Sequence, residues 1–176
     1  MRNIILYIAT SLDGYLARED GALDWLPQPT EDDMGYADFY DTIDTVVIGR
    51  TTYEQITQEL SPDVWAYEGK TSYVATSKTL TPDPNVSFIN GDIATFISNL
   101  KNAPGKDIWL VGGGKLIDAF VRANLIDKYI ITIIPFNSTP TSSFSISLEY
   151  AIPNFIMIKI SFSCYCPIYS LGSCSR

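Results

Sequence analysis

A chain of 176 residues with 46% hydrophobic residues is long enough for one domain with a substantial core. Its net charge of −8 argues against a nucleic-acid partner, because neutralising phosphates requires a basic surface. The sequence contains no histidine, which excludes a Ser-His-Asp triad and removes the most common zinc ligand.

The chain opens with an apolar run that predicts a buried strand over residues 3–10. A turn at 11–14 follows, and the segment 15–29 is expected to be a loop, because it contains Gly21, Pro27 and Pro29. The first run is too short for a signal peptide, and no run is long enough to span a membrane. We therefore expect a cytoplasmic protein without a membrane partner.

A helix is predicted from Thr30 to about Thr42, where Thr30-x-x-Asp33 has the form of a capping box. A short strand over 45–48 follows. Gly49 then introduces a second helix that extends to about Leu60. Thr51-x-x-Glu54 has the form of another capping box at its start.

Strands are predicted over 72–76 and 86–89, with a proline-containing loop between them. Asp92 is expected to cap a helix that ends near Lys101. Strands alternating with helices at this spacing predict an α/β domain with a mostly parallel sheet.

The segment 107–135 has the densest pattern. A buried strand over 108–111 precedes three glycines at 112–114, a helix that stops near Asn124, and a β-branched strand over 129–134. The glycines fit a tight turn or the close approach of a ligand's phosphates to a helix N-terminus. A P-loop is excluded because Leu116 follows Lys115, and Ile117 breaks the Rossmann fingerprint.

The end of the chain differs in composition. Residues 136–176 are rich in serine and carry three charged side chains, and 156–162 fit a strand. Cys164, Cys166 and Cys174 all lie here. Because their number is odd and no histidine is present, neither a metal site nor a disulfide framework is predicted.

Four segments resemble the dihydrofolate reductase-like superfamily: 11–17 (SLDGYLA), 46–54 (VVIGRTTYE), 73–77 (YVATS) and 111–114 (VGGG). They are most similar to the reductase domain of the bacterial riboflavin-biosynthesis deaminase-reductase. The resemblance implies a three-layer α/β fold with helices on both faces of a mostly parallel central sheet. It covers about 3–135, so we predict an NADPH-binding domain over 1–135. Residues 136–176 would be an atypical segment of the same domain, divergent or altered by a reading-frame change.

The resemblance implies that NADPH lies across the carboxyl ends of the strands. Glycine turns at two helix starts would hold its pyrophosphate, and Arg50, Ser77 and Lys78 would hold its 2′-phosphate. For Arg50, a solvated charge at the helix end is the alternative. The cofactor-binding residues implied are Ala9, Leu16, Ala17, Gly49, Arg50, Thr51, Thr52, Thr76, Ser77, Lys78, Gly112, Gly113, Gly114 and Lys115.

The substrate side has weaker signals. Asp33 is the catalytic candidate, with a capping role as its alternative. Asp13 and Trp25 are candidates for substrate binding, against roles in a turn and in the core. Lys70 stands where the family usually carries an arginine for the folate tail.

The activity implied is an NADPH-dependent reduction of a C=N or C=O bond in a pteridine-like or ribosylaminopyrimidine-like molecule. The second hypothesis is a catalytically silent protein that binds or senses NADPH. The resemblance is also compatible with a homodimer.

Overall fold

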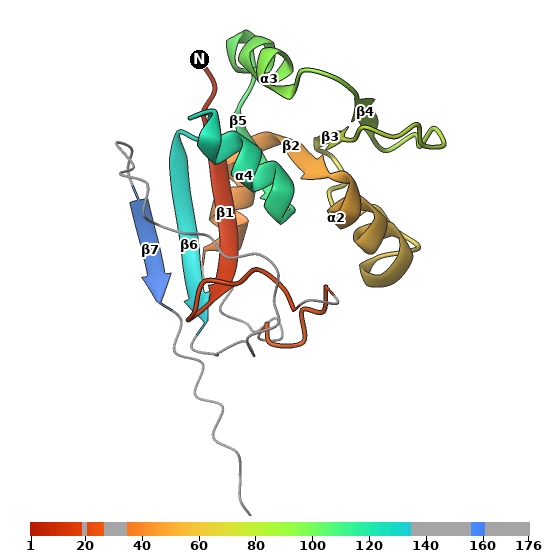
Figure 1. Cartoon of the computed structure of the whole chain (residues 1–176). Helices are drawn as coiled ribbons and strands as arrows, with labels where there is room; N and C mark the ends of the chain where they lie inside the picture. The colour runs from red at the N-terminus through yellow and green to blue at the C-terminus, as the bar shows by residue number, and fades with distance from the viewer. Residues whose placement is uncertain (19–20, 27–34, 135–155, 161–176) are drawn as a thin grey trace, which may run out of the picture.

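The computed structural model describes residues 1–18, 21–26, 35–134 and the backbone of 156–160. Seven strands form one sheet in the order β4-β3-β2-β5-β1-β6-β7, and every neighbouring pair is parallel (Figure 1). The strands are β1 (Ile4–Ser11), β2 (Ile43–Gly49), β3 (Thr71–Ala75), β4 (Ser87–Ile89), β5 (Asp107–Gly112), β6 (Lys128–Ile134) and β7 (Ile156–Ile160). The helices are α1 (Tyr36–Thr42), α2 (Arg50–Gln55) with its π-helical continuation η1 (Ile56–Leu60), α3 (Ile93–Asn102) and α4 (Gly114–Arg122).

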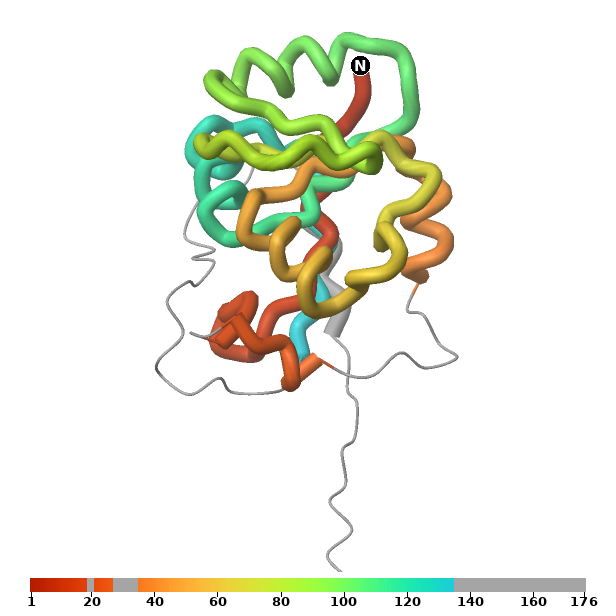
Figure 2. The backbone as a smooth tube through the Cα atoms, turned by 90° about the vertical axis from the view of Figure 1, so that its right-hand side faces the viewer, coloured from red at the N-terminus to blue at the C-terminus, as the bar shows by residue number. Residues whose placement is uncertain are grey.

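Side chains alternate between the two faces of the sheet, so each face has its own core. On β1, Ile4 and Leu6 join the cluster that packs on α3 and α4, where Phe120 is fully buried. Ile5 faces the other way and joins Phe39 of α1. Figure 2 shows α1 and α4 on opposite sides of β1. This confirms the predicted α/β architecture with helices on both faces.

The face under α1 is aromatic. The rings of Tyr7 and Phe39 stack with their centroids 4.3 Å apart, and Trp109 of β5 lies edge-on to both. The indole N–H of Trp109 donates to the Tyr7 carbonyl at 3.1 Å. These contacts fix α1 against the centre of the sheet.

One predicted helix start and one predicted capping box are wrong. The first helix begins at Tyr36, because Gly35 has a left-handed φ of 79° that a continuous helix from Thr30 cannot contain. The capping pair Thr30 and Asp33 lies outside the described residues. The capping box at Thr51 is also wrong: β2 extends to Gly49, which is the N-cap residue, and Thr51 is already helical.

The other helix boundaries agree with the sequence. Asp92 caps α3 by accepting hydrogen bonds from the N–H groups of Ala94 and Thr95, at 3.0 and 3.3 Å. Asn124 has a φ of 52°, the left-handed conformation expected just after a helix. β7 confirms a strand near the end of the chain, and it pairs with β6 along the edge that would otherwise be bare. No helix in the described ranges is long and apolar enough to cross a membrane.

Candidate functional site

The carboxyl edge of the sheet brings the two glycine turns into contact. β2 and β5 are paired so that Ile48 lies opposite Gly112. A Cβ atom added to Gly49 would lie 3.1 Å from the backbone nitrogen of Gly113, and one added to Gly113 would lie 2.9 Å from Thr52 Oγ1. A side chain at either position would meet the other turn at these distances, so glycine favours the close approach.

Each of the two turns starts a helix, so two helix N-termini meet at one place. Gly49 is the N-cap residue of α2 and Gly113 that of α4, and neither helix start receives a hydrogen bond from a capping side chain. The peptide bond between Gly112 and Gly113 is cis. Since the first N–H groups of a helix lack partners within it, an anion placed beside both starts would be stabilised by donors from two helices.

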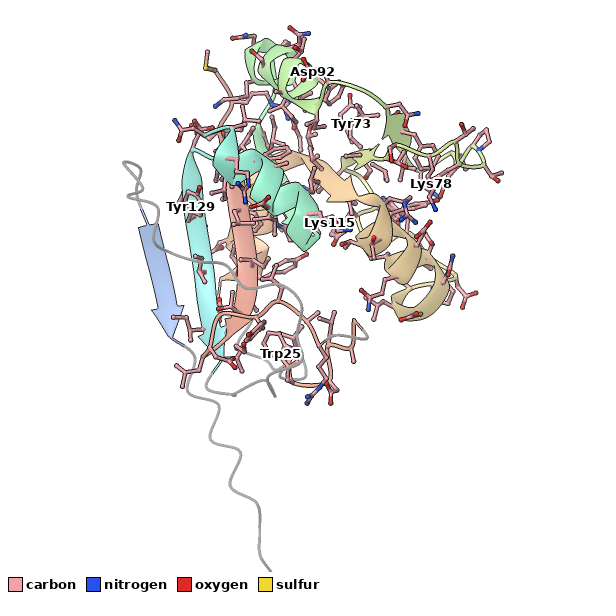
Figure 3. All side chains as sticks on the ribbon, viewed as in Figure 1. Trp25, Tyr73, Lys78, Asp92, Lys115 and Tyr129 are labelled. Carbon is pink, nitrogen blue, oxygen red and sulfur yellow. The ribbon has the colours of Figure 1, made fainter. Side chains whose placement is uncertain are left out.

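Basic side chains lie on the segments that meet at this edge. The Arg50 guanidinium, on the first turn of α2, is 2.5 Å from Glu54 Oε2. Lys115 lies at the start of α4, and Lys78 on the segment after β3 (Figure 3). Both lysines are exposed, and neither forms an ion pair with any residue that the structure describes. These charges remain available to an anionic ligand.

The segment after β3 is folded by its own side chains and fastened to α2. The Lys78 N–H donates to Thr76 Oγ1 at 3.0 Å, which closes a tight turn around Ser77. Further along, Asp83 accepts a hydrogen bond from the Tyr53 hydroxyl at 2.7 Å. Burial and the neighbouring Asp83 carboxylate raise the pKa of Tyr53 to about 12. α2 therefore holds the segment that carries Ser77 and Lys78.

Three of the predicted cofactor-binding residues lie at or just after the carboxyl end of β1. Ala9 lies opposite Thr132 of β6 and is half-buried, like Ala17. Leu16 packs against the core cluster under α4. Ala9 lies in β1 near its carboxyl end, and Leu16 and Ala17 lie on the loop that follows it.

The rest of the loop after β1 is held by polar contacts. The Ser11 hydroxyl donates to Asp13 Oδ1 at 2.6 Å, so Asp13 helps to form the turn. Gln55 of α2 donates to the Gly21 carbonyl at 3.0 Å. Trp25 is buried, with 8% of its surface exposed, near the carboxyl ends of β1 and β6. The hydrogen bond from Gln55 thus holds the loop after β1 against α2.

Lys70 is not brought together with the glycine turns. It precedes β3, whose carboxyl end Ala75 lies opposite Gly49, so Lys70 is at the opposite edge of the sheet. Its ammonium donates to the carbonyls of Tyr40 and Ile43, both at 2.9 Å, and lies 4.2 Å from the centre of the Tyr40 ring. These contacts give Lys70 a structural role at the end of α1. The catalytic candidate Asp33 lies outside the described residues.

The sequence interpretation missed Glu54 and Asp83 as neighbours of the site. Glu54 was assigned to a capping box, although its spacing of four from Arg50 also suits an ion pair on one helix face. No local pattern could connect Tyr53 to Asp83, which lie 30 residues apart. Within the described ranges, no group of three or more cysteine, aspartate or glutamate side chains could hold a metal ion.

Comparison with known proteins gives concordant matches. The family model of the RibD C-terminal domain matches residues 2–137. The uncharacterized Bacillus subtilis (strain 168) protein YwjB is 47% identical over 136 residues, which cover 76% of this chain and 77% of YwjB. YyaP, an uncharacterized protein of the same strain, is 36% identical over 143 residues, covering 76% and 75%. A crystal structure from Shewanella sp. PV-4, provisionally named a riboflavin biosynthesis protein, is 33% identical with a TM-score of 0.67, covering 86% of each chain.

Proposed function

The chain belongs to the family of the RibD C-terminal domain, and from this premise we propose that it is an NADPH-dependent reductase. Its substrate would be a small ribosylaminopyrimidine-like or pteridine-like molecule with a C=N or C=O bond. The family is associated with riboflavin biosynthesis and with reductase activity.

One observation carries the proposal: the contact between Gly49 and Gly113 places two uncapped helix starts side by side. A dinucleotide has a pyrophosphate with two adjacent anionic groups, which matches two adjacent sets of backbone donors. The site also lies at the carboxyl ends of parallel strands, where open α/β sheets bind ligands. The residues present therefore fit this cofactor.

The remaining contacts divide between the two ends of the dinucleotide. Arg50, Ser77 and Lys78 would hold the 2′-phosphate, for which a guanidinium supplies paired donors. Lys115 would add charge near the pyrophosphate. Ala9, Leu16 and Ala17 would flank the nicotinamide, which when bound supplies the hydride.

The loop after β1 would exclude water from the reacting end, since Leu16 packs on the core and Gln55 holds the loop at Gly21. Asp33 stays the predicted source of a proton, and Trp25 a predicted substrate contact. A homodimer also stays a prediction, to be tested by size-exclusion chromatography with light scattering.

The test is a binding experiment on the full chain with NADPH, NADH and buffer alone. We expect NADPH to raise the melting temperature and to bind more tightly than NADH, and Arg50→Ala to remove that preference. Asp118→Ala is the matched control, because it removes an ion pair on α4 without touching the site. If NADPH gives neither a thermal shift nor measurable binding, the proposal is wrong.

The catalytically silent alternative has its own supporting observation. Two candidates for substrate binding are already engaged within the chain: Asp13 by the Ser11 hydroxyl, and Lys70 by the carbonyls of Tyr40 and Ile43. A silent protein would bind NADPH but not oxidise it with any pterin or aminopyrimidine. Oxidation of NADPH that requires one of these compounds, and that falls in Asp33→Asn, would exclude this alternative.

A further inference from the structure

The Arg50 guanidinium is held by a carboxylate of its own helix. Its Nη1 atom lies 2.5 Å from Glu54 Oε2, one turn further along α2. The two side chains are 31% and 33% exposed, so water only partly screens the pair. Among the described residues, Glu54 is the only ion-pair partner of Arg50.

A second carboxylate is hydrogen-bonded to α2. Asp83 accepts the hydrogen bond of the Tyr53 hydroxyl, and the charges of both Asp83 and Glu54 add to burial in raising the pKa of Tyr53. Two negative charges therefore lie close to the second turn of the helix.

The consequence for a phosphate ligand follows from charge. A phosphate takes two donors of a guanidinium, so it must displace the Glu54 carboxylate or share the cation with it. In both cases the like charges of carboxylate and phosphate oppose binding. A ribose that carries only hydroxyl groups does not have to displace this carboxylate.

We infer that Glu54 is a specificity-determining residue that competes with the 2′-phosphate of NADPH for Arg50. It lowers the discrimination between NADPH and NADH that Arg50 would otherwise give. This inference rests on the proposed function, because it requires a dinucleotide whose 2′-phosphate reaches Arg50.

The experiment compares the wild-type chain with Glu54→Gln, Arg50→Ala and the double variant by calorimetric titration. The probes are NADPH, NADH, adenosine 2′,5′-bisphosphate and AMP. In Glu54→Gln we expect NADPH and the bisphosphate to bind about fivefold more tightly, and NADH and AMP to change less than about twofold. In the Arg50→Ala background, Glu54→Gln should give no gain. Asp118→Asn, in the i,i+4 pair of α4, controls for a general loss of negative charge.

Five results would overturn the inference. Weaker NADPH binding in Glu54→Gln would mean that Glu54 orients Arg50 instead of competing for it. Weaker NADH binding would mean that Glu54 accepts a ribose hydroxyl. Equal tightening of both dinucleotides would mean a general charge effect. If the wild type binds no dinucleotide, the proposed function fails and this inference with it, whereas NADPH binding that Glu54→Gln leaves unchanged overturns only the role of Glu54.

Discussion

The polar groups at the two edges of the sheet differ in whether they have partners within the chain. At the amino edge the buried Arg2 side chain donates to Asp44, to Thr45 Oγ1 at 2.6 Å and to the Lys106 carbonyl at 2.5 Å. Lys101 is likewise paired with Asp127 at 2.7 Å. At this edge, groups of the chain itself pair with Arg2 and Lys101.

At the carboxyl edge, two helix starts and two lysines have donors without a partner in the described residues. The helix starts at Gly49 and Gly113 have no capping side chain, although Asp92 shows that this chain can cap a helix. Lys78 and Lys115 form no ion pair within the described residues. A helix end without partners within the chain has donors that contact water or a ligand. Under the proposed function, the amino edge would serve stability and the carboxyl edge binding.

The largest expected effect concerns the amino edge. Asp44→Ala leaves the Arg2 guanidinium, whose side chain is 6% exposed, without its carboxylate. We expect a loss of about 3 kcal/mol in the free energy of unfolding, measured with urea, and an unchanged affinity for NADPH. The control Asp118→Ala breaks an exposed pair and should cost about 0.5 kcal/mol. If Asp44→Ala weakened NADPH binding in the folded protein, the two edges would not be independent.

The second prediction concerns the carboxyl edge. Gly49→Ala places a methyl group 3.1 Å from the backbone nitrogen of Gly113, and backbone cannot rotate out of the way. We expect a loss of about 2 kcal/mol in stability. NADPH affinity should fall by about tenfold or more, because the two helix starts move apart. Gly69→Ala is the control: nothing lies within 4 Å of the added atom, so only its positive φ of 78° costs stability. Unchanged NADPH binding in Gly49→Ala would contradict the proposed site.

The pH dependence of stability tests the contribution of Asp44 at the amino edge. Burial raises the pKa of Asp44, but hydrogen bonds from the Lys106 N–H and the Thr45 hydroxyl, with the charge of Arg2, lower it by more. The folded-state pKa is thus below the ordinary value of 3.8. The stability that Asp44 gives is therefore fully present above 3.8 and is lost as the pH falls through the folded-state pKa. Urea unfolding of Asp44→Asn should show a smaller loss of stability in acid than the wild type. Equal acid sensitivity would show that other carboxylates control it.

The sequence could predict local features of the structure but not the contacts between distant segments. The glycine turns were predictable because a strand, a glycine and a helix form a local pattern, and the parallel sheet then placed both turns at one edge. The start of α1 could not be predicted, because a Thr-x-x-Asp pattern is common and does not show that Gly35 adopts a left-handed conformation. The pairs Arg2–Asp44 and Tyr53–Asp83 join distant segments, so only the folded chain reveals them.

The smallest expected effect tests whether α2 positions the segment after β3. Tyr53→Phe removes the hydroxyl that donates to Asp83, while the ring can keep its edge-on contact with Phe88, at 5.6 Å between centroids. Stability should fall by about 1 kcal/mol, the value of one hydrogen bond.

NADPH affinity should fall by about threefold and NADH affinity by less. Under the proposed function only NADPH would contact Lys78, and the segment that carries Lys78 loses its hydrogen bond to α2. Asp83→Asn separates positioning from charge: its amide oxygen can still accept the hydrogen bond, so NADPH affinity should be kept or increased. If Tyr53→Phe weakened both dinucleotides equally, the Tyr53–Asp83 contact would support the fold alone, and the carboxyl edge would share the structural role assigned to the amino edge.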